Sequence, residues 1–270
     1  MKVNQVKLVY FSPTGTTQKV MESIAKGLAI KNVKHINLTL PAESSQIYPV
    51  FSDELVIMGA PVYGGRIPVD AIKRFSQLKA NDTLVIPVVV YGNRAFEDAL
   101  LELNNLALEL GFRPIAGGAF IGEHSFATKS ITIANGRPDS LDVQKAIAFG
   151  AKIKTKVSDL QPSDLQIDLE LPGSFPYEAD GVRKLAVSPI TKKDICTVCG
   201  TCASVCPTAA ISVEEKVTTQ TSLCIRCCAC IKTCPEKARI MADETWTNIA
   251  NWLQENCSTR KEPQVFGVEM

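Results

Sequence analysis

The sequence predicts an α/β protein in which a doubly wound, five-stranded parallel sheet is followed by a small cysteine-rich domain. Two observations predict this arrangement. Residues 1–157 alternate short β-branched runs with longer stretches of helical periodicity, a pattern typical of a parallel sheet covered by helices on both faces. Residues 189–242 hold nine of the ten cysteines, eight of them in two equally spaced runs. We therefore expect two parts with different chemistry.

Five strands are predicted from short apolar runs rich in β-branched residues. They cover residues 6–11, 33–38, 55–58, 83–91 and 114–121, and the run 83–91 is the most hydrophobic of the chain. Ligands of such folds bind at the carboxyl ends of the strands. The loops at 12–17, 61–66 and 91–94 are therefore the first candidates for a binding site.

Helices are predicted between these strands and near the end of the chain. They cover residues 17–30, 69–78, 95–110, 139–157 and 245–257. Pro68 starts the second of them and Gly111 ends the third. In the last helix Trp246, Ile249 and Leu253 fall on one face, so we expect that helix to dock on the body of the protein.

The segment 158–188 loses this periodicity and is rich in turn signals such as Leu171-Pro172-Gly173. We predict a linker here, packed against the protein because it carries Phe175 and Tyr177. The predicted division is thus a first domain at 1–157, a linker at 158–188, a second domain at 189–242, and a C-terminal helix and tail at 243–270.

The two cysteine runs share the spacing C-x2-C-x2-C-x3-C-P, and each cysteine of the second run lies 28 positions after its counterpart in the first. The first run is Cys196, Cys199, Cys202 and Cys206, and the second is Cys224, Cys227, Cys230 and Cys234. This spacing is the bacterial ferredoxin signature for [4Fe–4S] clusters. A zinc site is the alternative, but Cys₄ zinc sites use C-x2-C pairs and not this longer pattern twice.

Over residues 189–242 the chain resembles bacterial two-cluster ferredoxins, which are small α+β domains. The resemblance implies two [4Fe–4S] clusters that exchange their fourth ligands. The first cluster would take Cys196, Cys199, Cys202 and Cys234, and the second Cys224, Cys227, Cys230 and Cys206. Cys228 stands where the first run has Gly200; it is not assigned as a ligand, although it could replace Cys227. Cys257 lies outside both runs and is expected to be a packed or surface thiol.

Bulk composition excludes several other functions. A formal net charge of +1 with scattered basic residues gives no reason to expect nucleic-acid binding. No apolar stretch approaches the roughly 20 residues of a membrane span, and the first residues lack an apolar leader. Thiolates that ligate iron need a reducing compartment. We therefore expect a soluble cytoplasmic protein from cells that tolerate low-potential iron–sulfur chemistry, such as anaerobes.

A second motif is the loop Ser12-Pro13-Thr14-Gly15-Thr16-Thr17 between the first strand and the first helix. Hydroxyls, a glycine and free N–H groups at a helix N-terminus can bind a phosphate. The loop lacks the lysine of a Walker A motif, and the chain has no G-x-G-x-x-G motif. The alternative interpretation is a loop that only caps the helix.

This loop resembles the [ST]-x-T-G-x-T loop with which flavodoxins bind the phosphate of FMN. The resemblance implies two further flavin loops, after the third and fourth strands. The implied FMN-binding residues are Ser12, Thr14, Gly15, Thr16, Thr17, Pro61, Tyr63, Gly64, Gly65, Tyr91, Gly92, Asn93 and Arg94. Tyr63 is a candidate for stacking on the flavin, and the charge of Arg94 would raise the flavin potential.

Together the two parts resemble fused flavodoxin–ferredoxin proteins over nearly the full length. The resemblance implies a flavodoxin-like sheet and a two-cluster ferredoxin-like domain that relay electrons between FMN, the clusters and redox partner proteins. No catalytic residue is assigned. Two alternatives stay open: a flavin-dependent reductase of a small substrate, with Tyr63 and His124 as possible proton donors, and a redox-responsive protein whose docking depends on its clusters.

Overall fold

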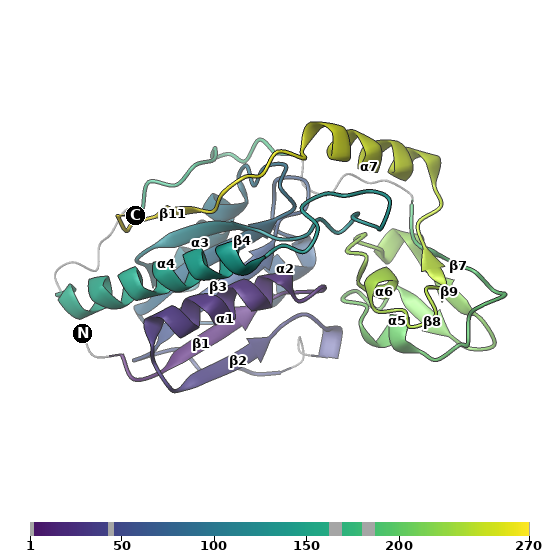
Figure 1. Ribbon diagram of the computed structural model, residues 1–270. Helices are drawn as coiled ribbons and strands as arrows, with labels where there is room; N and C mark the ends of the chain where they lie inside the picture. Colours follow the sequence, from purple (N-terminus) through teal and green to yellow (C-terminus); the bar gives the residue numbers. More distant parts are fainter. Residues whose placement is uncertain (1–2, 43–45, 162–168, 180–186, 270) are drawn as a thin grey trace.

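The protein has a large α/β lobe and a small cysteine-rich lobe, with helix α7 above the junction between them (Figure 1). The computed structural model describes residues 3–42, 46–161, 169–179 and 187–269. Among the helices described, none is long and apolar enough to cross a membrane.

A seven-stranded sheet forms the centre of the large lobe. Its strands are β1 (Val6–Tyr10), β2 (Val33–Asn37), β3 (Leu55–Pro61), β4 (Thr83–Tyr91), β5 (Phe112–Pro114), β6 (Gly117–Ile121) and β11 (Gln264–Phe266). Their order is β2-β1-β3-β4-β6-β11, with β5 also paired to β4. All pairings are parallel except that of β11 with β6. The parallel part has the flavodoxin-like order 2-1-3-4-5, which confirms the predicted fold class.

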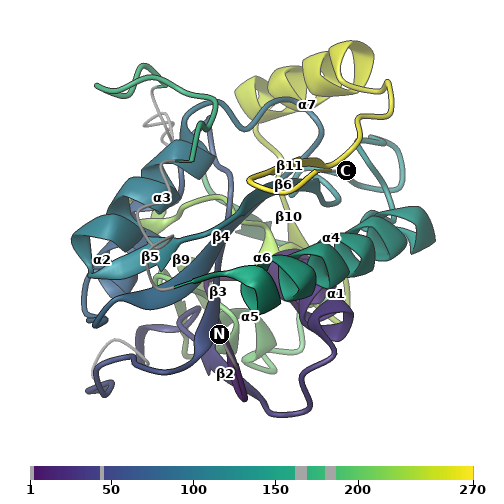
Figure 2. The same cartoon turned by 90° about the vertical axis from the view of Figure 1, so that its left-hand side faces the viewer.

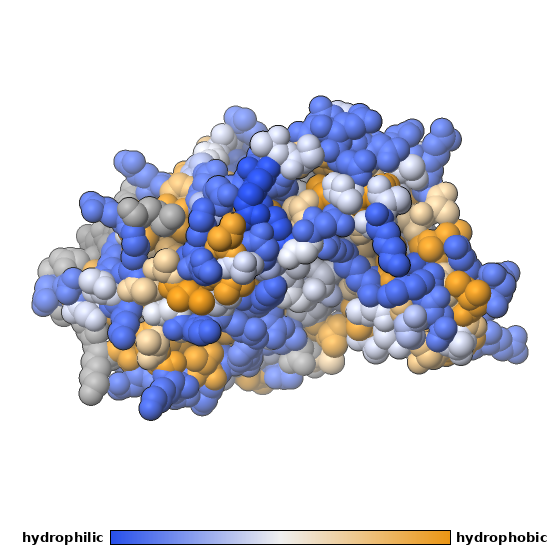
Figure 3. Space-filling view, in the orientation of Figure 1, coloured by the Kyte–Doolittle hydropathy of each residue, from blue (hydrophilic) through white to orange (hydrophobic). Residues whose placement is uncertain are grey.

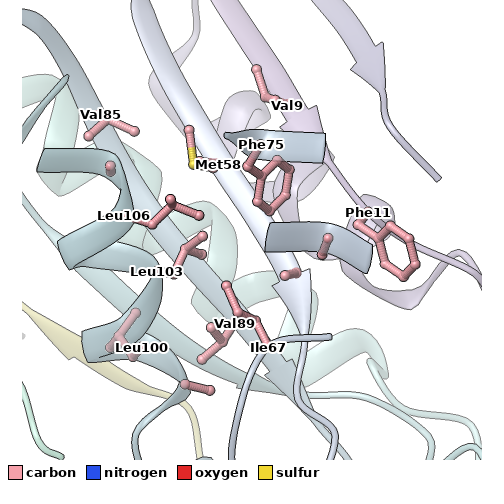
Figure 4. Packing of buried hydrophobic residues seen from close by; sticks show 14 of the residues in the cluster. Val9, Phe11, Met58, Ile67, Phe75, Val85, Val89, Leu100, Leu103 and Leu106 are labelled. Carbon is pink, nitrogen blue, oxygen red and sulfur yellow. The ribbon is translucent and has the colours of Figure 1, made fainter. Parts of the chain in front are cut away.

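Two pairs of helices cover the two faces of this sheet (Figure 2). They are α1 (Thr16–Leu28) with α4 (Ser140–Asp159), and α2 (Val69–Phe75) with α3 (Ala99–Glu109). Figure 4 shows the core under α2 and α3, where Met58, Phe75, Val89 and Leu103 pack together. Helices α1 and α4 touch at glycines, because a Cβ at Gly150 would stand 2.0 Å from the carbonyl oxygen of Ile24.

The predicted number of five strands is wrong, for two reasons. The expected strand at 114–121 is two strands, β5 and β6, which pair with successive parts of β4. Pro114 ends β5 and lacks an N–H donor, and the chain continues through Ile115 and Ala116 before β6 begins. The second reason is β11, a three-residue strand from the tail that joins the edge of the sheet.

The small lobe repeats its backbone as well as its cysteine spacing. Its elements are β7 (Ile190–Thr191), α5 (Thr201–Ser204), β8 (Ile211–Val213), β9 (Val217–Thr219), a 3₁₀ turn (Thr221–Leu223), α6 (Ala229–Lys232) and β10 (Arg239–Ile240). Left-handed φ angles recur at positions 28 apart, at Val198 and Arg226 and at Gly200 and Cys228. The cysteine repeat is therefore also a structural repeat.

Helix α7 (Glu244–Asn256) docks as predicted, with Trp246 and Leu253 buried against the segment that holds Phe126 and Ile133. The chain beyond it returns across the large lobe to β11 (Figure 1). Buried Asn93 holds this return: its amide donates to the carbonyls of Cys257 and Thr259 at 2.6 and 2.8 Å.

The expected linker lies partly outside the described residues, at 162–168 and 180–186. Its described middle part packs on α3, where the Asp98 carboxylate accepts hydrogen bonds from the backbone N–H groups of Ser174 and Ala179. Tyr177 packs under the guanidinium of Arg66, at 4.2 Å from ring centroid to Cζ. The described part of the segment is therefore packed, as expected, although Phe175 itself is 75% exposed and contacts the ring of Tyr177.

Candidate functional site

A deep cleft lies at the carboxyl ends of the strands, between the two lobes. Its volume is about 1310 Å³, which exceeds the range of about 300–1,000 Å³ typical of small-molecule sites. The loops after β1, β3, β4 and β6 form one side, and α7 and the second cysteine run form the other. The predicted flavin residues that line it are Thr14, Thr16, Pro61, Tyr63, Gly64, Tyr91, Gly92 and Arg94.

The loop before α1 has the geometry of an anion site. Gly15 adopts a left-handed conformation (φ 80°) directly before α1, and as the N-cap residue it has no side chain to accept the N–H groups of the first turn. The hydroxyl of Ser12 accepts the N–H of Gln18 at 3.2 Å, which folds the loop over the first turn. Thr17 is fully buried, and its hydroxyl has no hydrogen-bond partner among the described residues. An unpaired hydroxyl beside the first backbone N–H groups of α1 fits a phosphate.

Five predicted flavin residues do not line the cleft: Ser12, Gly15, Thr17, Gly65 and Asn93. The first three shape the loop before α1. Gly65 faces another loop, since a Cβ there would stand 1.7 Å from a carboxylate oxygen of Glu97. Asn93 turns its amide to the tail.

Tyr63 stands between the cleft and the cysteine-rich lobe. Burial raises the pKa of its phenol well above the ordinary value, and the nearby thiols of Cys227 and Cys228 raise it further, against a hydrogen bond with Ser125. The phenol is therefore protonated at neutral pH. Tyr91 is 3% exposed at the end of β4 and packs on Phe96, with ring centroids 5.5 Å apart.

His124, which the sequence suggested only as a possible proton donor, lines the cleft. Its Nδ1 accepts the N–H of Phe126 at 3.0 Å, so the neutral ring carries its proton on Nε2. Burial lowers its pKa to about 4, and the charges of Lys232 and Arg94 act in the same direction. A side chain at Gly92 would collide with the ring, because its Cβ would stand 2.2 Å from Cδ2.

The charge of Arg94 has a partner that sequence reasoning missed. Its guanidinium pairs with Glu97 at 2.7 Å, and both side chains are 36% exposed. The ammonium of Lys261, from the tail, donates to the Arg94 carbonyl. The Glu97 carboxylate therefore opposes the electrostatic effect that was expected of Arg94 on a flavin.

Two further cavities lie inside the small lobe, and cysteines from both runs line each. One is lined by Cys196, Cys199, Cys202 and Cys234, and the other by Cys206, Cys224, Cys227 and Cys230. These are the two sets that the ferredoxin resemblance implies. Cys228 also lines the second cavity, where its thiol contacts the Arg226 carbonyl. Among the described residues, no three His, Cys, Asp or Glu side chains are placed to hold a single metal ion.

The last cysteines of the two runs, Cys206 and Cys234, have equivalent surroundings in the two halves of the repeat. The N–H of Ala210 points at Cys206 Sγ (3.2 Å), and that of Ala238 points at Cys234 Sγ (3.3 Å). Such bonds stabilise a thiolate ligand. Burial raises the pKa of the Cys227 thiol to about 12. Bound metal would favour the thiolate there.

Comparison with known proteins finds one family match, within the small lobe. Residues 189–212, which contain the first cysteine run, match the model of the 4Fe–4S binding domain family. The sheet thus has the flavodoxin-like strand order, and a 24-residue part of the small lobe is similar to 4Fe–4S binding domains. No curated protein matches the chain.

Solved structures similar to the sheet domain include several flavodoxins. Flavodoxin 2 of Bacillus cereus is 18% identical, with a TM-score of 0.42 over 57% of this chain and 99% of that one. A WrbA-like flavodoxin of Agrobacterium tumefaciens is 14% identical, with a TM-score of 0.40 over 58% and 99%. An archaeal flavodoxin is 15% identical, with a TM-score of 0.39 over 57% and 99%. The strand order, not these scores, establishes the fold.

Proposed function

We propose that this protein is an electron-transfer iron–sulfur flavoprotein. It binds FMN in the cleft and two [4Fe–4S] clusters in the small lobe, and it relays electrons between them and redox partner proteins. Residues 1–157 are the FMN-binding domain, completed by β11 from the tail, and residues 189–242 are the ferredoxin-like domain. Residues 158–188 link them, and 243–270 form the helix and tail.

The loop before α1 takes the FMN phosphate, with the Thr14 and Thr16 hydroxyls and the first backbone N–H groups of α1 as donors. The loops at Tyr63 and Tyr91 border the ring system, and the Nε2–H of His124 offers a donor at its edge. When bound, the flavin exchanges one or two electrons and each cluster exchanges one. The protein contributes placement and the exclusion of water.

The observation that carries this proposal is the position of Ile225. It lines both the large cleft and the cavity of Cys206, Cys224, Cys227 and Cys230, and it packs against the core of the sheet domain. The Ile225 side chain thus lies between the flavin site and the second cluster, and Tyr63 stands beside the same thiols. The cluster of Cys224 is therefore the one next to the flavin.

The first cluster lies on the partner side of this relay. Cys199 is exposed, and its neighbours Ile195 and Val198 are 42% and 36% exposed. Figure 3 shows apolar side chains on the surface of the small lobe. Exposed apolar residues beside a cluster suit brief docking of a redox partner.

Contacts between the two lobes hold the flavin site and the cluster sites in place relative to each other. The guanidinium of Arg74, on α2, donates to the carbonyls of Leu38 and Pro207, one from each lobe. The ammonium of Lys232 pairs with Glu123 across the same junction. The return of the tail to β11 adds a third connection.

Anaerobic purification tests the proposal first, since the chain should contain one flavin and about eight iron atoms. Rapid mixing with a one-electron reductant should then show cluster bleaching followed by flavin reduction. Ile225→Ala should slow the second phase severalfold. Thr197→Ala, its counterpart in the first run, should not. If the rate of flavin reduction did not depend on the oxidation state of the clusters, the proposed relay would be refuted.

A second candidate function is reduction of a small substrate at the flavin. Two observations favour it. The cleft is larger than a typical small-molecule site, and Trp252 of α7, which is 53% exposed, lines it as well. Turnover of a small acceptor that Trp252→Ala weakens, with cluster-to-flavin transfer unchanged, would support it.

A further inference from the structure

Arg239 lies between the two cysteine-lined cavities and lines both of them. It is 3% exposed and begins β10, opposite Thr191 of β7. Its counterpart in the first half of the repeat, 28 positions earlier, is Ile211. The repeat therefore supplies an apolar residue in one half and a cation in the other.

Neutral groups hold the guanidinium of Arg239 in place. Nη1 donates to the Thr191 hydroxyl at 2.6 Å and Nη2 to the Thr219 hydroxyl at 2.7 Å. Nη2 also approaches Cys230 Sγ at 3.9 Å. The Nε–H is buried without a hydrogen-bond partner, and no carboxylate of the described residues forms an ion pair with this side chain.

A buried cation without a counter-ion is strongly destabilising, and so is a buried N–H without an acceptor. Negatively charged groups with sulfur acceptors in the two cavities would give the cation a counter-ion and the N–H an acceptor. A cluster with four thiolate ligands is such a group, and the side chain of Arg239 borders one on either side.

We propose that Arg239 is a tuning residue shared by the two clusters, whose fixed positive charge raises both reduction potentials. The inference rests on the proposed function and deepens it. On reduction each cluster gains one electron, supplied by the flavin or a redox partner, and the cation stabilises the added negative charge. A single residue thus raises the reduction potentials of both clusters together, so that the difference between the two potentials stays small.

Redox titration of the complete protein, followed by electron paramagnetic resonance, tests this inference. Arg239→Gln should lower both cluster potentials, each by at least about tenfold in the reduction equilibrium, or about 59 mV for a one-electron couple. Arg239→Lys should stay near the wild-type potentials, because it keeps the charge. Lys237→Gln is the control: it removes the same charge from an exposed position two residues away, where solvent and salt screen it.

Iron and flavin contents are measured first in every variant. Full contents with unmoved potentials in Arg239→Gln, or a shift in one cluster alone, would overturn the shared role and leave the proposed function intact. If Arg239→Gln does not retain iron, Arg239→Lys decides: wild-type potentials support the role of the charge, and a tenfold fall overturns it. A wild-type chain without clusters or flavin refutes the proposed function itself.

Discussion

Asn93 is expected to hold the C-terminal tail, and with it the two lobes, in place. It is 2% exposed, and its amide donates to the carbonyls of Cys257 and Thr259. Its Oδ1 accepts the N–H of Lys261 at 3.2 Å. Its φ of 66° is left-handed, which asparagine tolerates better than most residues. A substitution at this position therefore tests both the hydrogen bonds and the backbone conformation.

Asn93→Ala removes these three hydrogen bonds, each worth about 1 kcal/mol, so about 3 kcal/mol is lost from this source. A fourth and longer bond, from Arg137 Nη1 to Oδ1 at 3.5 Å, is lost as well and contributes little at that length. Alanine at this left-handed position, without the side-chain hydrogen bonds of asparagine, adds about 1 kcal/mol of backbone strain. The expected loss is about 4 kcal/mol for Asn93→Ala. Asn93→Gly is the matched control, with an expected loss of about 3 kcal/mol, because glycine loses the same bonds without the strain.

Urea unfolding of the loaded protein measures these free energies, and amide exchange at Gln264–Phe266 reports the release of β11. Exchange there should become faster in both variants, and cluster-to-flavin transfer should slow with it. Losses below about 1 kcal/mol in both variants, with unchanged exchange, would show that the tail is held by other contacts and refute the reasoning.

Three further predictions follow from single sites. Gly150→Ala should lose about 2 kcal/mol in thermal or urea unfolding, since its Cβ would stand 2.0 Å from the Ile24 carbonyl oxygen and force α1 and α4 apart; an unchanged midpoint would contradict the close packing. His124 should make stability depend on pH: its folded pKa of about 4 lies below its ordinary value, so the unfolded chain binds a proton first and stability falls as pH drops from about 6.5 towards 4. At pH 5 the fall amounts to about 2 kcal/mol, and His124→Gln should abolish it; a variant with the same pH profile as wild type would count against this assignment. Cys228→Gly should leave the iron content unchanged and stability within about 1 kcal/mol, because relief of a left-handed φ of 59° offsets the lost burial; loss of iron would make Cys228 a ligand.

Local patterns in the chain were enough to predict the fold class and to single out the eight cysteines that line the two small cavities. Helical and strand periods depend on neighbours a few residues apart, so β4 was predicted at its observed bounds. Cysteine spacing likewise constrains which thiols can reach one object, and the two sets lie around two cavities. The left-handed positions at Gly200 and Cys228 repeat because the spacing repeats.

The roles of single loop residues were beyond such patterns. Asn93 and Arg94 are adjacent, yet the amide of Asn93 binds the tail while Arg94 lines the cleft. The partner of Asn93 lies 164 residues away in the chain, and no local signal marks it. Strand β11 was missed for the same reason, since three residues acquire an extended pairing only when the edge of β6 is present.

The sequence by itself determined that this chain makes a parallel sheet with hydroxyl-rich and glycine-rich loops at its strand ends, and a lobe with two equally spaced runs of four cysteines. Both are short-range properties, encoded by period and spacing. Only the tertiary structure decided that Ile225 lines both the cleft and the cavity of the second thiol set, and that Arg239 lines the cavities of both sets. Those positions depend on how distant segments pack, because burial and charge act through space and not along the chain.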